Sequence, residues 1–206
     1  MAIVSLLWGN VAALRQENVK RLLAYGSVAH TGFLLLGLVA GNETGFSGMI
    51  YYLGVYTFMT AGAFGVLIVV EQGGSPVRVM SDLDGLYRRS PALALLLGAF
   101  LVSLAGIPPT AGFLAKYFMF KALIAAPHPE LAAFAVVNAL LAVYYYGRLG
   151  AHAWKKPTAD EATFEPSTLT ISSGQTVALT AALFVSLAAG LYPEPFLRMA
   201  RYAFGQ

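Results

Sequence analysis

Long apolar segments separated by short polar turns dominate the hydropathy pattern of the chain. Apolar stretches of about 20 residues are typical of membrane-spanning helices, because a helix rises about 1.5 Å per residue and the hydrocarbon core is about 30 Å thick. The pattern predicts helical segments over residues 20–40, 46–70, 91–105, 111–126, 131–152 and 177–191. Because no alternation typical of strands accompanies them, we predict an all-α, polytopic membrane helix bundle with about six full transmembrane helices.

The two ends of the chain differ from these crossings. Residues 2–14 are apolar but number only 13, too few to cross a bilayer as a helix. We therefore expect an N-terminal helix stub and interpret the chain as a fragment, or a split product, of a longer protein. At the other end, residues 193–206 combine apolar side chains with Arg198 and Arg201, which predicts a short amphipathic tail in the membrane interface. Residues 1–206 are thus expected to form a single transmembrane domain.

Composition narrows the classes of function. Charged residues make up 11% of the chain, against about 25% in soluble domains, and hydrophobic residues make up 58%. The absence of cysteine excludes disulfides and thiolate metal sites, and the net charge of +3, located mainly in loops, does not indicate nucleic-acid binding. The sequence contains no phosphate-binding loop, serine nucleophile elbow or zinc-binding histidine pair. Any catalysis is therefore expected to be movement of charge.

The segment SLAGIPPTAGFLAKYFMF, residues 103–120, carries the most informative ionisable residue. Its two adjacent prolines interrupt the helix, and Lys116 follows the break among Phe113, Leu114 and Phe118. A charge inside a crossing costs roughly 2.5–3.5 kcal/mol on insertion scales, so such a residue is a functional hypothesis by default. Apolar surroundings favour the neutral form of an amine, which predicts that Lys116 takes up and releases a proton near neutrality. The alternative is a lysine that snorkels to the interface.

His30 and a stripe of hydroxyls are further candidates for a proton path. His30 lies about halfway along the first crossing, where an imidazole can pass a proton between its two nitrogens or can be a neutral, hydrogen-bonded core residue. Tyr52, Tyr56 and Thr60 are spaced at i, i+4 and i+8, which places them on one helix face. Such a stripe can order a water chain or hydrogen-bond to a neighbouring helix.

The crossing at 131–152 has a polar face of its own. Asn138, Tyr145 and His152 are seven residues apart and share one side of the helix, with Arg148 nearby. Tyr145 is a candidate for lining a water path, and the tyrosines of this helix can equally form an interfacial aromatic belt.

Four segments in series resemble one known family. NVKRLLAYGSVAH (18–30), TAGAFGVL (60–67), the break segment 103–120 and VNALLAVYYYGRL (137–149) are similar, in this order, to the antiporter-like, proton-translocating membrane subunits of NADH–quinone oxidoreductase (respiratory complex I), and most of all to the N type. That family has fourteen helices in two inverted five-helix repeats, each with one broken helix. The resemblance implies that this chain is the C-terminal half, from the end of helix eight onward, and that Lys116 is the proton-relay lysine on the broken helix.

The resemblance also implies a function and a setting. The chain would couple quinone reduction to proton pumping as a subunit of the enzyme, with no cofactor of its own; NAD(H), FMN, iron–sulfur clusters and quinone are expected in other subunits. Its partners would be neighbouring antiporter-like subunits, small membrane subunits and the lipid bilayer of a bacterial inner (plasma) membrane, with no nucleic acid.

Two other functions are left open by the sequence. One is a subunit of a multi-component sodium/proton antiporter. The related subunits of that type carry His, His and Lys at the places of Tyr52, Tyr56 and Thr60, which weighs against this alternative. The other is a structural or assembly fragment, for which substitution of Lys116 or His30 would leave proton pumping unchanged.

Overall fold

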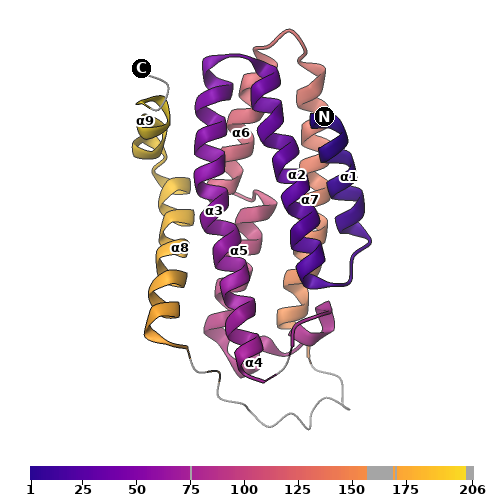
Figure 1. The fold of residues 1–206 in the computed structure, drawn as a ribbon, viewed down its shortest axis with the longest axis vertical. Coiled ribbons are helices and arrows are strands. Elements are labelled where there is room, and N and C mark those ends of the chain that lie inside the picture. Colours follow the sequence, from indigo (N-terminus) through magenta and orange to yellow (C-terminus); the bar gives the residue numbers. More distant parts are fainter. Residues whose placement is uncertain (75, 157–168, 170, 203–206) are drawn as a thin grey trace.

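The computed structural model describes residues 1–74, 76–156, 169 and 171–202, and these form a bundle of helices (Figure 1). In this part of the chain the elements, in order, are α1 (Ala2–Leu14), α2 (Val19–Ala40), α3 (Glu43–Gln72), the 3-10 helix η1 (Met80–Leu83), α4 (Leu86–Arg89), α5 (Pro91–Ala105), α6 (Ala111–Ile124), α7 (Glu130–Trp154), α8 (Ser173–Leu191) and α9 (Glu194–Tyr202). The predicted all-α membrane bundle is confirmed.

Four of the helices in the described ranges, α2, α3, α7 and α8, are long and apolar enough to cross a membrane. By contrast, α5 and α6 contain only 15 and 14 residues. Figure 1 shows α6 above α5, with the irregular link between them near the middle of the bundle. The proline-interrupted region is therefore a pair of short helices that meet inside the bundle rather than two full crossings.

The break between α5 and α6 follows from the residues around it. Helix α5 ends at Ala105 and is capped by Gly106, which has a left-handed conformation (φ 82°) and whose N–H donates to the carbonyls of Val102 and Ser103. Glycine is the usual residue at such a helix end because it has no Cβ to strain. Two consecutive prolines follow, joined by a cis peptide bond, and they cannot continue the hydrogen-bond ladder. The last carbonyls of α5 are thereby left without helical partners.

Two glycines allow other helices to approach this break closely. A Cβ at Gly112 on α6 would collide with the backbone carbonyl of Ser103 on α5. A Cβ at Gly190 on α8 would lie 2.6 Å from the backbone nitrogen of Ala111. Small residues at such contacts are how membrane helices pack tightly without a hydrophobic driving force between them.

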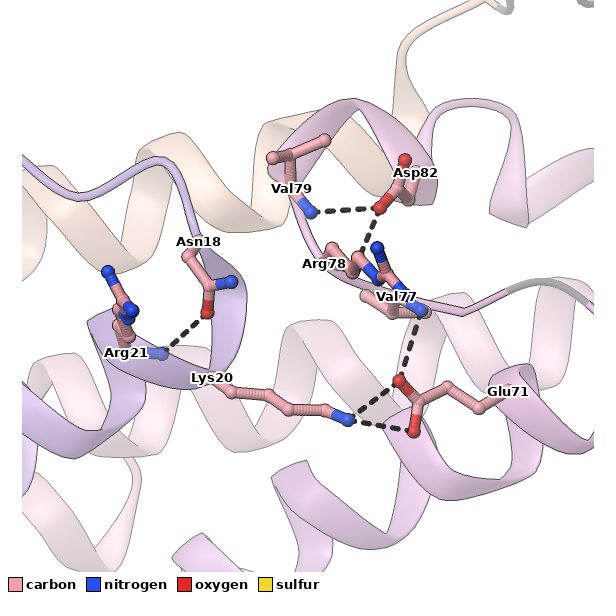
Figure 2. A network of polar contacts seen from close by, with 8 residues as sticks. All are labelled: Asn18, Lys20, Arg21, Glu71, Val77, Arg78, Val79 and Asp82. Atoms are coloured by element: carbon pink, nitrogen blue, oxygen red, sulfur yellow. Dashed lines mark hydrogen bonds and ion pairs between the residues drawn. The ribbon is translucent and has the colours of Figure 1, made fainter.

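A polar network ties the lower ends of α2 and α3 to the connector that follows α3 (Figure 2). The Lys20 ammonium lies 2.7 Å from one carboxylate oxygen of Glu71 and 3.0 Å from the other. Glu71 also accepts a hydrogen bond from the Val77 N–H, and the carboxylate of Asp82 accepts one from the Arg78 N–H. This network fixes the connector that leads into α5.

The predicted amphipathic tail overlaps α9. Leu197 and Ala200 face the bundle and are buried, whereas Met199 and Tyr202 are exposed. Residues 203–206 of the predicted tail lie outside the described residues. The interfacial position of this helix stays a prediction.

Candidate functional site

The Lys116 side chain ends in the break between α5 and α6. Its Nζ donates hydrogen bonds to the carbonyls of Ala105 (2.6 Å) and Leu104 (3.2 Å), and the residue is 3% exposed. These carbonyls belong to the last turn of α5, where the partial negative charge of the helix dipole favours a cation. The side chain runs past Gly106, where a Cβ would lie 2.8 Å from Lys116 Cδ. The ammonium thus points into the bundle, and the lysine does not snorkel outward.

The groups around the Lys116 amine can accommodate both its protonated and its neutral form. The Lys116 Nζ lies over the face of the Phe33 ring on α2, 5.4 Å from the ring centroid, a geometry that attracts a cation. Within the described part of the chain, Lys116 forms no ion pair with a carboxylate. A neutral amine retains two N–H groups, and the carbonyls of Leu104 and Ala105 provide one acceptor for each. Loss of a proton would therefore leave no N–H donor unpaired.

His30, on α2, is the centre of a cluster of tyrosines. It is 3% exposed, and its Nδ1 lies 2.8 Å from the Tyr52 hydroxyl on α3. On its other side, Nε2 lies 3.3 Å from the Tyr146 hydroxyl on α7. A phenol hydroxyl can donate or accept a hydrogen bond, so either ring nitrogen can carry the proton. The ring of Tyr56 packs on the imidazole with the two centroids 4.6 Å apart.

The structure brings together some of the predicted hydroxyls and not others. Tyr52 and Tyr56 both contact His30, and the Tyr56 hydroxyl donates to the Ser27 side chain (2.7 Å). The Thr60 hydroxyl and the Tyr145 hydroxyl are buried, and neither has a hydrogen-bond partner among the described residues. Buried hydroxyls of this kind are the groups to which an internal water chain attaches.

Two contributors to the site were missing from the residues predicted from sequence. Phe33 lies three residues after His30, so helical spacing alone places both on neighbouring parts of one face. Tyr146 was not singled out among the tyrosines of α7. Neighbouring residues point about 100° apart on a helix, and only the packing of α7 against α2 decides which tyrosine meets His30.

The lower part of the α7 polar face belongs to a separate cluster. His152 Nδ1 lies 2.5 Å from a carboxylate oxygen of Asp84, and the Lys155 ammonium lies 3.4 Å from the other oxygen. Arg148 donates to the backbone carbonyl of Gln16. The described residues contain no group of three or more His, Cys, Asp or Glu side chains that could hold a metal ion.

A helix interrupted inside a membrane bundle, with a buried lysine hydrogen-bonded to the carbonyls at the break, indicates a membrane transport protein. In transporters, discontinuous helices place ion-binding groups near the middle of the bilayer. The chain belongs to the NADH:quinone oxidoreductase/Mrp antiporter transmembrane family, which matches residues 1–142.

Individual relatives agree with this assignment. The chain is 46% identical over 201 residues to NADH-quinone oxidoreductase subunit N 2 of Solibacter usitatus, covering 98% of this chain and 40% of the relative. It is 43% identical over 207 residues to subunit N 1 of Koribacter versatilis, again covering 98% and 40%. The resemblance to the N type inferred from sequence is confirmed. The chain spans about two fifths of the length of these relatives.

Solved structures give the same fold. A chain of respiratory complex I from Thermus thermophilus with bound aureothin superposes with a TM-score of 0.76 at 34% identity, covering 96% of this chain and 43% of that one. A chain of the Mrp complex from Dietzia superposes with a TM-score of 0.83 at 23% identity, covering 98% and 45%. The second likeness shows the shared fold alone.

Proposed function

We propose that this chain is a proton-translocating membrane subunit of an NADH–quinone oxidoreductase and that Lys116 is its proton-relay group. The observation that carries the proposal is the Lys116 amine on the terminal carbonyls of α5, buried and without a carboxylate partner in the described structure. Family membership and the names of the relatives support the enzyme to which the subunit would belong.

The proposed path runs through His30. When Lys116 takes up a proton, the added N–H is stabilised by the negative end of the α5 dipole and by the Phe33 ring face. His30 passes protons by exchanging the nitrogen that is protonated, because each nitrogen faces a hydroxyl, that of Tyr52 or that of Tyr146. Water attached to hydroxyls such as that of Tyr145 would complete the path.

In this proposal the chain moves protons and carries no redox centre. Hydride and electron transfer through NAD(H), FMN, iron–sulfur clusters and quinone would take place in other subunits. The chain would lie beside other antiporter-like and small subunits in the plasma membrane of a bacterium, which is supported by the bacterial origin of the relatives. Changes in neighbouring subunits would then shift the proton affinity of Lys116.

Membrane vesicles from cells that carry the chain and from cells that lack it test this proposal. With NADH and quinone supplied, acidification of the vesicle interior, followed with a pH-sensitive dye, is expected only when the chain is present. Sodium-driven proton exchange without a quinone substrate is expected to be the same in both. The opposite result, in which only sodium-driven exchange depends on the chain, would assign it to an antiporter instead.

The contact between His30 and Tyr52 provides a second test. Tyr52→Phe removes only the hydroxyl that lies 2.8 Å from Nδ1. Proton translocation is expected to slow roughly 2- to 10-fold, the factor that corresponds to the loss of one hydrogen bond worth about 0.5–1.5 kcal/mol. The matched control is Tyr117→Phe on α6, whose side chain is on the exterior at 47% exposure. Equal rates in the two variants would remove the Tyr52 hydroxyl from the path.

A further inference from the structure

A polar cavity lies at the opposite end of the bundle from the network of Figure 2, where α3 begins, α6 approaches its end and α9 packs beside α3 (Figure 1). Its volume is about 90 Å³, and it opens to the exterior. The side chains that matter for its chemistry are Glu43, Thr44 and Ser47 of α3, Lys121 of α6, and Leu197 and Arg201 of α9.

The side chains around this cavity carry charges of both signs, and these charges are not paired within the described structure. Lys121 and Arg201 form no hydrogen bond or ion pair with another described residue, and the same holds for the carboxylate of Glu43. The two cations therefore do not lie within ion-pair distance of the anion, although all three line one cavity. This arrangement complements a ligand that carries an anionic group and a cationic group separated by a short linker.

The position of the cavity beside exposed apolar side chains indicates that the rest of the ligand is apolar. Lys121 is in the last turn of α6, and Ile124 at the end of that helix is exposed. On α9, Met199 and Tyr202 are exposed beside the cationic Arg201, as in helices that lie in a membrane interface. A ligand that reaches the cavity from this side has a polar head and an apolar body.

We propose that the cavity binds the head group of a zwitterionic phospholipid of the phosphatidylethanolamine type. The phosphate pairs with Lys121 and Arg201, and the ammonium pairs with Glu43. The hydroxyls of Thr44 and Ser47 can donate to the phosphate oxygens. A phospholipid without an amine, such as phosphatidylglycerol, leaves Glu43 unpaired next to the phosphate. The lipid would thereby link α9 to the α3–α6 pair, independently of proton transfer.

Native mass spectrometry of the chain, purified at full length with the subunits that stay bound to it, tests this site. Dioleoyl phosphatidylethanolamine, dioleoyl phosphatidylglycerol and inorganic phosphate are added in separate titrations. Wild type is expected to bind phosphatidylethanolamine most tightly. The double variant Lys121→Gln/Arg201→Gln is expected to bind it about 30-fold more weakly, at about fivefold for each basic residue near the membrane surface.

Two further variants make the test specific. Arg21→Gln removes one exposed cation at the other end of the bundle and is expected to leave lipid binding unchanged. Glu43→Gln is expected to abolish the preference for phosphatidylethanolamine over phosphatidylglycerol while phosphate pairing persists. Equal lipid binding by wild type and the double variant would overturn the site. Displacement of the lipid by millimolar inorganic phosphate would show a free-phosphate site and would equally overturn the proposal.

Discussion

Lys116→Met is expected to reduce NADH-driven proton translocation to background, a loss of about 100-fold or more, because a positioned proton-transfer group contributes roughly 10²- to 10⁴-fold. Methionine is close to lysine in length and has no exchangeable proton. The carbonyls of Leu104 and Ala105 lose their donor, at about 1–3 kcal/mol. The cost of burying an amine disappears at the same time. The variant is therefore expected to fold, and the measurement is dye-detected acidification of vesicles together with quinone reduction.

Two companion variants separate a relay from a structural role of the amine. Lys116→Arg keeps a permanent cation that can still bind the α5 carbonyls but does not release its proton. It is expected to be as inactive as Lys116→Met, whereas a purely structural amine would be replaced successfully. Lys156→Met makes the same substitution at an exposed position after α7 and is expected to pump normally. Full pumping by Lys116→Met would remove this residue from the mechanism.

Gly112→Ala is expected to give the largest loss of stability among single-methyl additions. The new Cβ would collide with the Ser103 carbonyl, which is backbone and cannot move aside as a flexible side chain can. Overpacking of this kind costs about 1–3 kcal/mol and occasionally more. Separation of α6 from α5 would also shift Lys116 away from its carbonyl partners. The expected result is a lower unfolding temperature in detergent and reduced pumping.

The control for this substitution lies on the neighbouring helix. At Gly98 on α5 a Cβ would meet no atom within 4 Å. Gly98→Ala is therefore expected to leave the unfolding temperature unchanged or to raise it, since alanine is favoured over glycine in a helix by about 1 kcal/mol. If both variants were equally stable, the contact between α6 and the end of α5 would be looser than the structure indicates.

The features that follow from local rules were predictable from sequence. Two consecutive prolines in the interior of a helical pattern end the helix, and an ammonium buried in an apolar stretch is costly, so Lys116 could be identified as a candidate without a structure. Helical spacing likewise placed Tyr52 and Tyr56 on one face, and both contact His30.

The remaining features depend on how separate helices rotate against one another. Nothing in the YYY run at 144–146 indicates which hydroxyl reaches His30, and the structure selects Tyr146. His152 shares a face with Tyr145 but binds Asp84 in a connector 68 positions away in sequence. Thr60 continues the stripe on α3 yet has no hydrogen-bond partner in the described structure. Contacts of this kind are set by tertiary packing, which periodicity does not encode.

The open end of α5 and the side chain that covers it depend on each other. Bare peptide carbonyls deep in a lipid environment are tolerated only when something nearby hydrogen-bonds to them. Lys116 supplies those bonds, and the carbonyls in turn supply the solvation that an amine would otherwise seek from water. A continuous helix at this place would leave the Lys116 amine without hydrogen-bond acceptors. An apolar residue in place of Lys116 would leave the last carbonyls of α5 without a donor. The interruption and the lysine thus stabilise each other, so a change to either one alone carries an energetic cost.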